Sequence, residues 1–133
     1  MRVLLDEHLP HRLRHLFVPD VEAVTVAYLG WKGTRNGDLL RAAQDAGFDV
    51  LVTMDRGLPH QQDLRGLQIG VLLLTAKSNR FVDLEPLLAG VHEVLKRIQP
   101  GEIIRITAGP VSEVEPDAPP IIPEIVRRAQ DEL

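Results

Sequence analysis

The sequence predicts an α/β domain in which helices cover both faces of a mostly parallel sheet. Short apolar, β-branched runs alternate with segments whose Leu and Ala residues recur at helical spacing, which is the pattern of βαβ units. The chain has 133 residues, of which 44% are hydrophobic and 26% charged, as is typical of one globular domain with its own core. Because the composition changes after Gly109, we expect the domain to cover residues 1–109 and an extension to cover 110–133.

Apolar runs predict four strands along this domain, and a weaker alternating pattern over 21–27 predicts one more. The first ends at Asp6, the third ends just before Met54 and Asp55, and the fourth is the most apolar. We expect a parallel arrangement because helical segments alternate with the strands, and right-handed crossovers then determine the winding. The expected strands cover residues 2–5, 21–27, 48–53, 67–74 and 102–107.

Three helical segments are expected between these strands. Pro10 lies near the start of the first, which covers 9–17. Asn36 is expected to cap the second, which Gly47 ends as a C-terminal glycine. The third is a long helix over 81–98, in which Leu, Val and Ile residues line one face.

The extension over 110–133 is rich in proline and acidic residues. Four prolines fall within eight residues, and acidic side chains lie among them. Residues 81–133 carry five Lys and Arg against ten Asp and Glu, whereas residues 1–80 carry ten against nine, so the negative charge lies in the C-terminal part. We expect an extended, partly polyproline tail with a short terminal helix over 124–133.

Composition excludes several classes of protein. The chain has no cysteine, which excludes disulfides, thiolate zinc sites and a cysteine nucleophile and favours a cytoplasmic location. No apolar run reaches the roughly 20 residues that a transmembrane helix needs, so we expect no membrane association. Aromatic residues make up only 4% of the chain, so few side chains can stack on nucleic-acid bases.

Three aspartates at the ends of predicted elements are the candidate metal ligands. Asp6 closes the first strand, Asp55 follows the third, and Asp38 lies in the first turn of the helix between them. Ligands of open parallel sheets bind beyond the carboxyl ends of the strands, so these carboxylates can converge if the two strands are neighbours. Converging acids repel one another unless a cation neutralises them, and Mg²⁺ or Mn²⁺ prefers oxygen ligands. Such a cation can bind a phosphodiester oxygen and activate water.

Each acid also has a simpler structural interpretation. Asp6 can begin a capping turn, Asp38 can interact with the helix dipole, and Asp55 can be a turn residue. Glu7 ranks below these three, because in an extended chain it points away from Asp6 unless the strand has already ended.

Basic residues beside the acids are candidates for binding phosphates. Lys32, Arg35 and Arg56 flank the acids in sequence and can position a nucleic-acid backbone, although ordinary surface charge is the simpler interpretation. His8 adjoins the acidic pair and can orient a phosphate or a water. Two further histidines at helical spacing can bind zinc, but without an HExxH signature a solvated helix face is the simpler interpretation. This pair consists of His11 and His15.

Three stretches carry the candidate acids: Leu4-Leu5-Asp6-Glu7-His8-Leu9-Pro10, then Leu29-Gly30 with Asp38-Leu39-Leu40 and Ala43, and Leu51-Val52-Thr53-Met54-Asp55. Over about residues 2–76 the sequence thereby resembles the compact PIN-like family, described as predicted nucleases of toxin–antitoxin systems. The resemblance implies a PIN-like three-layer α/β/α fold and a Mg²⁺- or Mn²⁺-dependent endoribonuclease. It also implies that Asp6, Asp38 and Asp55 are metal-site acids with Glu7 as a fourth catalytic acid, that RNA is the substrate, and that an antitoxin protein is a partner.

The chain departs from the family's pattern at two places. His8 stands where such proteins usually have Asn, and Arg56-Gly57-Leu58 stands where they usually have a second acid and then Phe. Without that acid the expected metal site has one carboxylate fewer, so a non-catalytic interaction module is an alternative. The tail of such a module can lie on an antitoxin or on the second subunit of a homodimer.

A receiver-like phosphoacceptor domain is a further alternative. Receiver domains also place an acidic pair after the first strand and an acceptor aspartate after the third, as Asp6, Glu7 and Asp55 do here. The lysine expected after the last strand is missing from Ile106-Thr107-Ala108-Gly109-Pro110, and Asp38 has no role in that scheme.

Overall fold

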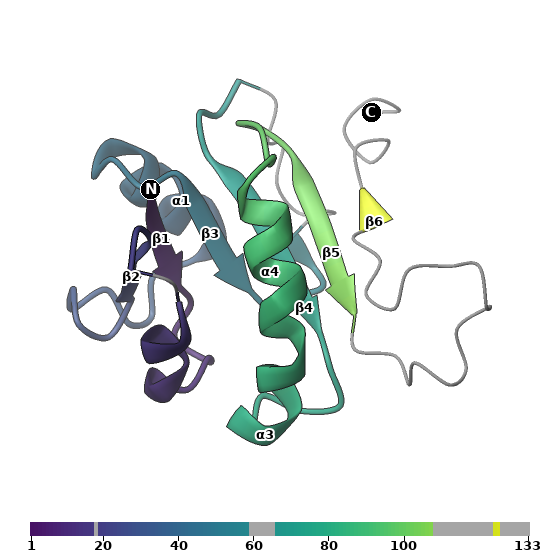
Figure 1. Cartoon of the computed structure of the whole chain (residues 1–133). Helices are drawn as coiled ribbons and strands as arrows, with labels where there is room; N and C mark the ends of the chain where they lie inside the picture. Colours follow the sequence, from purple (N-terminus) through teal and green to yellow (C-terminus); the bar gives the residue numbers. More distant parts are fainter. Residues whose placement is uncertain (18, 59–65, 108–123, 126–133) are drawn as a thin grey trace.

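The described residues form a sheet of six strands in the order β2-β1-β3-β4-β5-β6 (Figure 1). The structure is a computed structural model, and it describes residues 1–17, 19–58, 66–107 and 124–125. Strands β1 to β5 run parallel, which confirms the predicted mostly parallel sheet, and β6 pairs antiparallel with β5. The strands are β1 (Arg2–Leu5), β2 (Glu22–Thr25), β3 (Val50–Thr53), β4 (Gly70–Thr75), β5 (Ile103–Thr107) and β6 (Glu124–Ile125).

The strand order places β1 between β2 and β3. The chain leaves β1 toward β2 and then returns past β1 to β3, from which β4 and β5 continue in the opposite direction. In register, Leu4 of β1 pairs with Val24 of β2 and with Leu51 of β3. A crevice forms where a strand order reverses, because the connections that leave the two adjacent strands diverge. The carboxyl ends of β1 and β3 are therefore the place where this sheet can hold a ligand.

Helices cover both faces of the sheet, so the chain forms a three-layer α/β/α arrangement. On one face lies α1 (Asn36–Asp45). On the other face lie the 3-10 helix η1 (His11–Leu16), α3 (Phe81–Leu84), the 3-10 helix η2 (Glu85–Leu87) and α4 (Leu88–Leu95). Figure 1 shows α4 in front of the sheet and α1 behind it.

Alternate residues of the central strands face two different cores. Leu4 belongs to the core that α1 covers, whereas Val3 and Leu5 belong to the core that α4 covers. All three side chains are fully buried. A strand buried on both faces has no solvent-facing positions, which is why the sequence of β1 is a continuous apolar run instead of an alternating one.

The helix expected over 81–98 is divided into α3, η2 and α4 and ends at Leu95. Pro86 lies in η2, and proline has no N–H to donate to the carbonyl one turn earlier, so the ladder of helical hydrogen bonds is interrupted there. The helix expected over 9–17 is observed as the short 3-10 helix η1 over His11–Leu16.

The described part of the tail is a strand. Glu124 and Ile125, where the sequence predicts the start of a terminal helix, pair with β5 as β6 instead. The predictions for 110–123 and 126–133 lie outside the described residues. Within the described ranges, no helix has both the length and the apolar character needed to cross a membrane.

Candidate functional site

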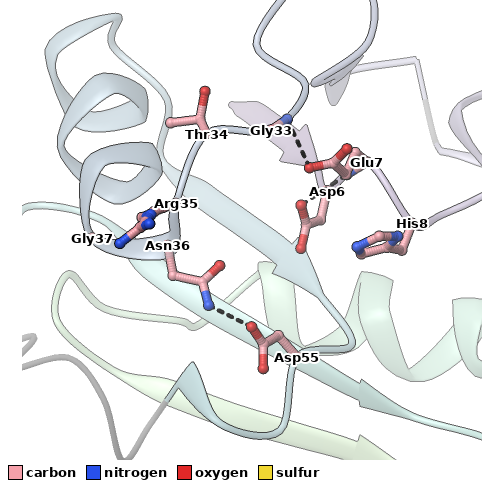
Figure 2. Close-up of a pocket in the computed structure, with 9 residues that line it drawn as sticks. All are labelled: Asp6, Glu7, His8, Gly33, Thr34, Arg35, Asn36, Gly37 and Asp55. Atoms are coloured by element: carbon pink, nitrogen blue, oxygen red, sulfur yellow. Dashed lines mark hydrogen bonds between the residues drawn. The ribbon is translucent and has the colours of Figure 1, made fainter.

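A pocket opens at the carboxyl ends of β1 and β3, where the strand order reverses (Figure 2). The turn after β1 forms one wall, the loop that leads into α1 forms another, and the first residues after β3 complete it. Its volume is about 430 Å³. The lining residues are Asp6, Glu7, His8, Gly33, Thr34, Arg35, Asn36, Gly37 and Asp55.

The loop before α1 reaches the pocket through two glycine turns. Gly30 and Gly33 have φ angles of 75° and 83°, which residues with a Cβ rarely adopt. The Gly33 N–H donates to Glu7 Oε1 at 3.0 Å and so ties this loop to the turn after β1. Because β1 already ends at Leu5, Glu7 lines the same pocket as its neighbour Asp6.

Asp6 is held at the end of β1 by donors from two strands. Asp6 is buried, with only 7% of its surface exposed. Oδ1 accepts the Glu7 N–H at 2.8 Å, and Oδ2 accepts the hydroxyl of Thr53 at 2.6 Å. The Asp6 N–H also donates to the carbonyl of Val52 at 3.0 Å. These contacts determine the direction in which the carboxylate points, so the site begins from a rigid strand end.

Thr53 connects the two aspartates, although the sequence patterns did not mark it as a site residue. It is fully buried at the end of β3. Its Oγ1 donates to Asp6 and accepts the N–H of Asp55 at 3.1 Å. The available signal was a hydroxyl at the end of a buried apolar strand, since a buried polar group needs a hydrogen-bond partner.

Asp55 follows β3 and is restrained from both sides of its carboxylate. Oδ1 accepts the Gly57 N–H at 2.9 Å, which closes a local turn. Oδ2 accepts a hydrogen bond from Asn36 Nδ2 (Figure 2). The first residue of α1 and the end of β3 are therefore joined across the pocket.

Helix α1 directs Asn36, not Asp38, into the pocket. The sequence predicts Asn36 as the N-cap, but Arg35 occupies that position and Asn36 is the first helical residue. Asp38 lies two residues further, about 200° around the helix. Its side chain is 68% exposed and pairs with Arg41 at 2.7 Å. This corrects the expectation that three aspartates converge: Asp6, Glu7 and Asp55 line the pocket, and Asp38 does not.

The predicted phosphate-binding residues divide into two groups. Arg35 and His8 line the pocket, and Figure 2 shows them on opposite sides of it. Lys32 and Arg56 are exposed side chains that do not line it. Arg35 and His8 can therefore contact a ligand inside the pocket, whereas Lys32 and Arg56 can only contact a part of the ligand that extends outside it.

The carboxylates suit a hard cation that completes its coordination shell with water or substrate oxygens. Among the described residues, no group of three or more His, Cys, Asp or Glu side chains is placed to hold a metal ion. Mg²⁺ is commonly held by one or two carboxylates and completes its shell with waters and substrate phosphates. From the described residues, each oxygen of Asp6 and Asp55 accepts one hydrogen bond, which leaves a second lone pair for a cation. These two residues, with Glu7 beside them, can thus hold Mg²⁺ or Mn²⁺ in an open site.

Comparison with protein-family models, with curated proteins and with solved structures found no match to this chain.

Proposed function

We propose that this protein is a PIN-like, metal-dependent endoribonuclease that hydrolyses RNA phosphodiesters. The observation that carries the proposal is the convergence of Asp6, Glu7 and Asp55 on one pocket at the reversal of the strand order. The proposal includes a role as the toxin of a toxin–antitoxin pair, in which an antitoxin protein holds the nuclease inactive.

The roles of the acids follow from their positions. Asp6 and Asp55 would hold Mg²⁺ or Mn²⁺, and the bound cation would polarise the phosphodiester and make a water more acidic. Thr53 orients the Asp6 carboxylate and fixes the backbone of Asp55, because its hydroxyl donates to the first and accepts the N–H of the second. Glu7 is positioned by Gly33 and faces the same space, where it can accept a proton from an attacking water.

The neutral and basic groups of the pocket complement a phosphodiester. Arg35 carries a positive charge to the wall opposite His8, and its guanidinium can bind two phosphate oxygens at once. Asn36 keeps Asp55 in place through its amide. Because these contacts address the backbone and not the bases, we expect cleavage with little dependence on sequence.

Cleavage of single-stranded RNA in the presence of Mn²⁺ tests the proposal. We expect Asp6→Asn and Asp55→Asn each to lower the rate by about 100-fold or more, because removing a metal-binding carboxylate should cost at least as much as removing its hydrogen-bonding neighbours. Asp38→Asn is the matched control: it removes the same charge from a side chain outside the pocket and should leave the rate unchanged. Equal rates for all three variants would refute the proposal.

A non-catalytic RNA-binding module is the second candidate, and the neutral Asn36 favours it. An amide stands beside Asp55 where a further acid would strengthen cation binding, and Asp38 is turned away. A calorimetric titration with Mn²⁺ separates the candidates. Heat that disappears in Asp6→Asn supports the nuclease, whereas RNA binding without any Mn²⁺ binding supports the module.

A further inference from the structure

A second basic surface borders the pocket on its His8 side. The loop between β4 and α3 reaches this side, because Asn79 Nδ2 donates to the carbonyl of His8 at 2.8 Å. Seventy-one positions separate these residues in the chain, so only the fold brings the loop to the pocket wall. In Figure 1, α3 lies at the lower end of the sheet, toward which the arrowheads of β3 and β5 point.

The loop between β4 and α3 is held in one shape by its own contacts. Ser78 Oγ donates to Asp83 Oδ2 at 2.5 Å and accepts the N–H of Arg80 at 3.0 Å. The carboxylate of Asp83 thereby accepts a hydroxyl of the loop. Lys77 and Arg80 are both exposed, and neither forms an ion pair with a described residue.

Arg12 extends this surface from the 3-10 helix η1. The carbon of its guanidinium lies 4.2 Å from the centre of the Phe81 ring. Phe81 directly follows Arg80 in the sequence, so Arg12 lies close to the β4–α3 loop. A guanidinium stacked on a ring has its flat face covered while its N–H edges remain free to donate to a phosphate. Like the other two cations, Arg12 is exposed and has no ion-pair partner in the described part of the chain. We call Arg12, Lys77 and Arg80 together the basic loop face.

We propose that the basic loop face binds the phosphates of an RNA strand that extends beyond the pocket. The inference rests on the proposed function and adds a binding surface for the part of the RNA that lies outside the pocket. A strand that crosses the pocket meets Arg35 on one side and, past His8, the basic loop face on the other. We expect a dinucleotide to occupy the pocket without contacting the basic loop face, so long substrates should gain affinity that short ones lack. This affinity is electrostatic and falls as salt rises.

Binding without cleavage tests the inference directly. Fluorescence anisotropy is measured in EDTA with a single-stranded RNA of about twelve nucleotides, within the range that single-strand sites cover. We expect the double variant K77E/R80E to weaken binding by about tenfold or more. The slope of log K against log salt should become shallower by roughly 0.7 for each phosphate that the variant no longer neutralises.

Arg97→Glu is the matched control for charge. Arg97 is exposed and follows α4, and its neighbour Ile98 packs against Gly70, the first residue of β4. Arg97 thus lies at the amino edge of the sheet, opposite to the pocket. We expect this variant to bind the RNA as the unchanged protein does. If K77E/R80E and R97E weaken binding equally per charge, or if the unchanged protein does not bind the RNA, the inference is overturned.

Cleavage assays with Mn²⁺ separate failure of the inference from failure of the proposed function. K77E/R80E should raise the KM for the long RNA and leave kcat and the cleavage of a dinucleotide unchanged. Cleavage by the unchanged protein, with K77E/R80E indistinguishable from R97E, removes the inference and keeps the nuclease. Binding through the basic loop face without any cleavage removes the nuclease and keeps the inference.

Discussion

Thr53 Oγ1 on β3 donates a hydrogen bond of 2.6 Å to Asp6 Oδ2 on β1. The same hydroxyl accepts the N–H of Asp55, so one buried side chain orients the acids that leave two adjacent strands. Both contacts exist because β1 and β3 are parallel neighbours whose carboxyl ends lie side by side. Thr53 thereby fixes the carboxylate of Asp6 and the backbone of Asp55 to the end of the sheet, whereas Asn36 and Gly57 hold the Asp55 carboxylate itself.

Removal of the Thr53 hydroxyl should weaken both the fold and the cation site. Thr53→Val keeps the shape but leaves Asp6 Oδ2 buried without this donor, which should lower the free energy of unfolding by about 1–3 kcal/mol. Mn²⁺ affinity should fall by about 10- to 100-fold, as for other groups that orient a ligand. Urea unfolding and calorimetry measure the two effects. Thr53→Ser restores the hydroxyl and should recover most of the affinity; equal affinities for Val and Ser would contradict this role.

Conversion of Asn36 to Asp should strengthen cation binding. The new carboxylate would stand beside Asp55, where repulsion between like charges lowers stability until a divalent cation neutralises it. We expect Asn36→Asp to melt at a lower temperature than the unchanged protein in EDTA and to gain more from added Mn²⁺. Thermal melts with and without Mn²⁺ measure this. Asn36→Ala also removes the amide but adds no charge, so a similar Mn²⁺ gain in both variants would argue against the explanation.

The Asp38–Arg41 pair should contribute little to stability and nothing to cation binding. Both side chains are about two-thirds exposed (68% and 66%), and exposed pairs within a helix contribute roughly 0.3–0.5 kcal/mol. We expect Asp38→Ala to change the free energy of unfolding by less than about 0.5 kcal/mol and to leave Mn²⁺ affinity unchanged. Urea unfolding and calorimetry provide the test. A large loss of Mn²⁺ affinity would mean that Asp38 reaches the pocket in solution.

The two glycine turns before α1 should differ in their effect on the site. Gly30→Ala and Gly33→Ala both place a Cβ on a residue with positive φ, with no neighbouring atom within 4 Å, so each should cost about 1–2 kcal/mol of stability from backbone strain alone. Alanine keeps the backbone N–H at both positions, but strain at positive φ shifts the backbone there. Because it is the Gly33 N–H, and not that of Gly30, that donates to Glu7 among the described contacts, we expect Gly33→Ala to lower cleavage beyond its effect on stability. Chemical unfolding and RNA cleavage, measured together, check this. Equal cleavage by both variants would show that Glu7 needs no support from the loop.

Much of the framework was predictable from local patterns. The apolar runs located β1, β3 and β4 within a few residues, because strands buried on both faces must be apolar throughout. Asp6 and Asp55 were found for the same reason: a charge directly after such a run marks the point where the chain leaves the core. The division of the helix over 81–98 at Pro86 was also readable in principle, since proline cannot continue the hydrogen-bond ladder.

The membership of the site depended on tertiary geometry. Asn36 and Asp38 are two positions apart, and only the residue at which α1 begins determines which of them faces Asp55. Thr53 became visible as a link only when β1 was paired with β3, and the Asn79 contact to His8 depends on how far the β4–α3 loop travels along the edge of the sheet. Sequence patterns indicate which residues are buried, because burial selects the residue type at each position. Convergence of side chains depends on helix phase and strand order, which arise from packing between segments far apart in the sequence.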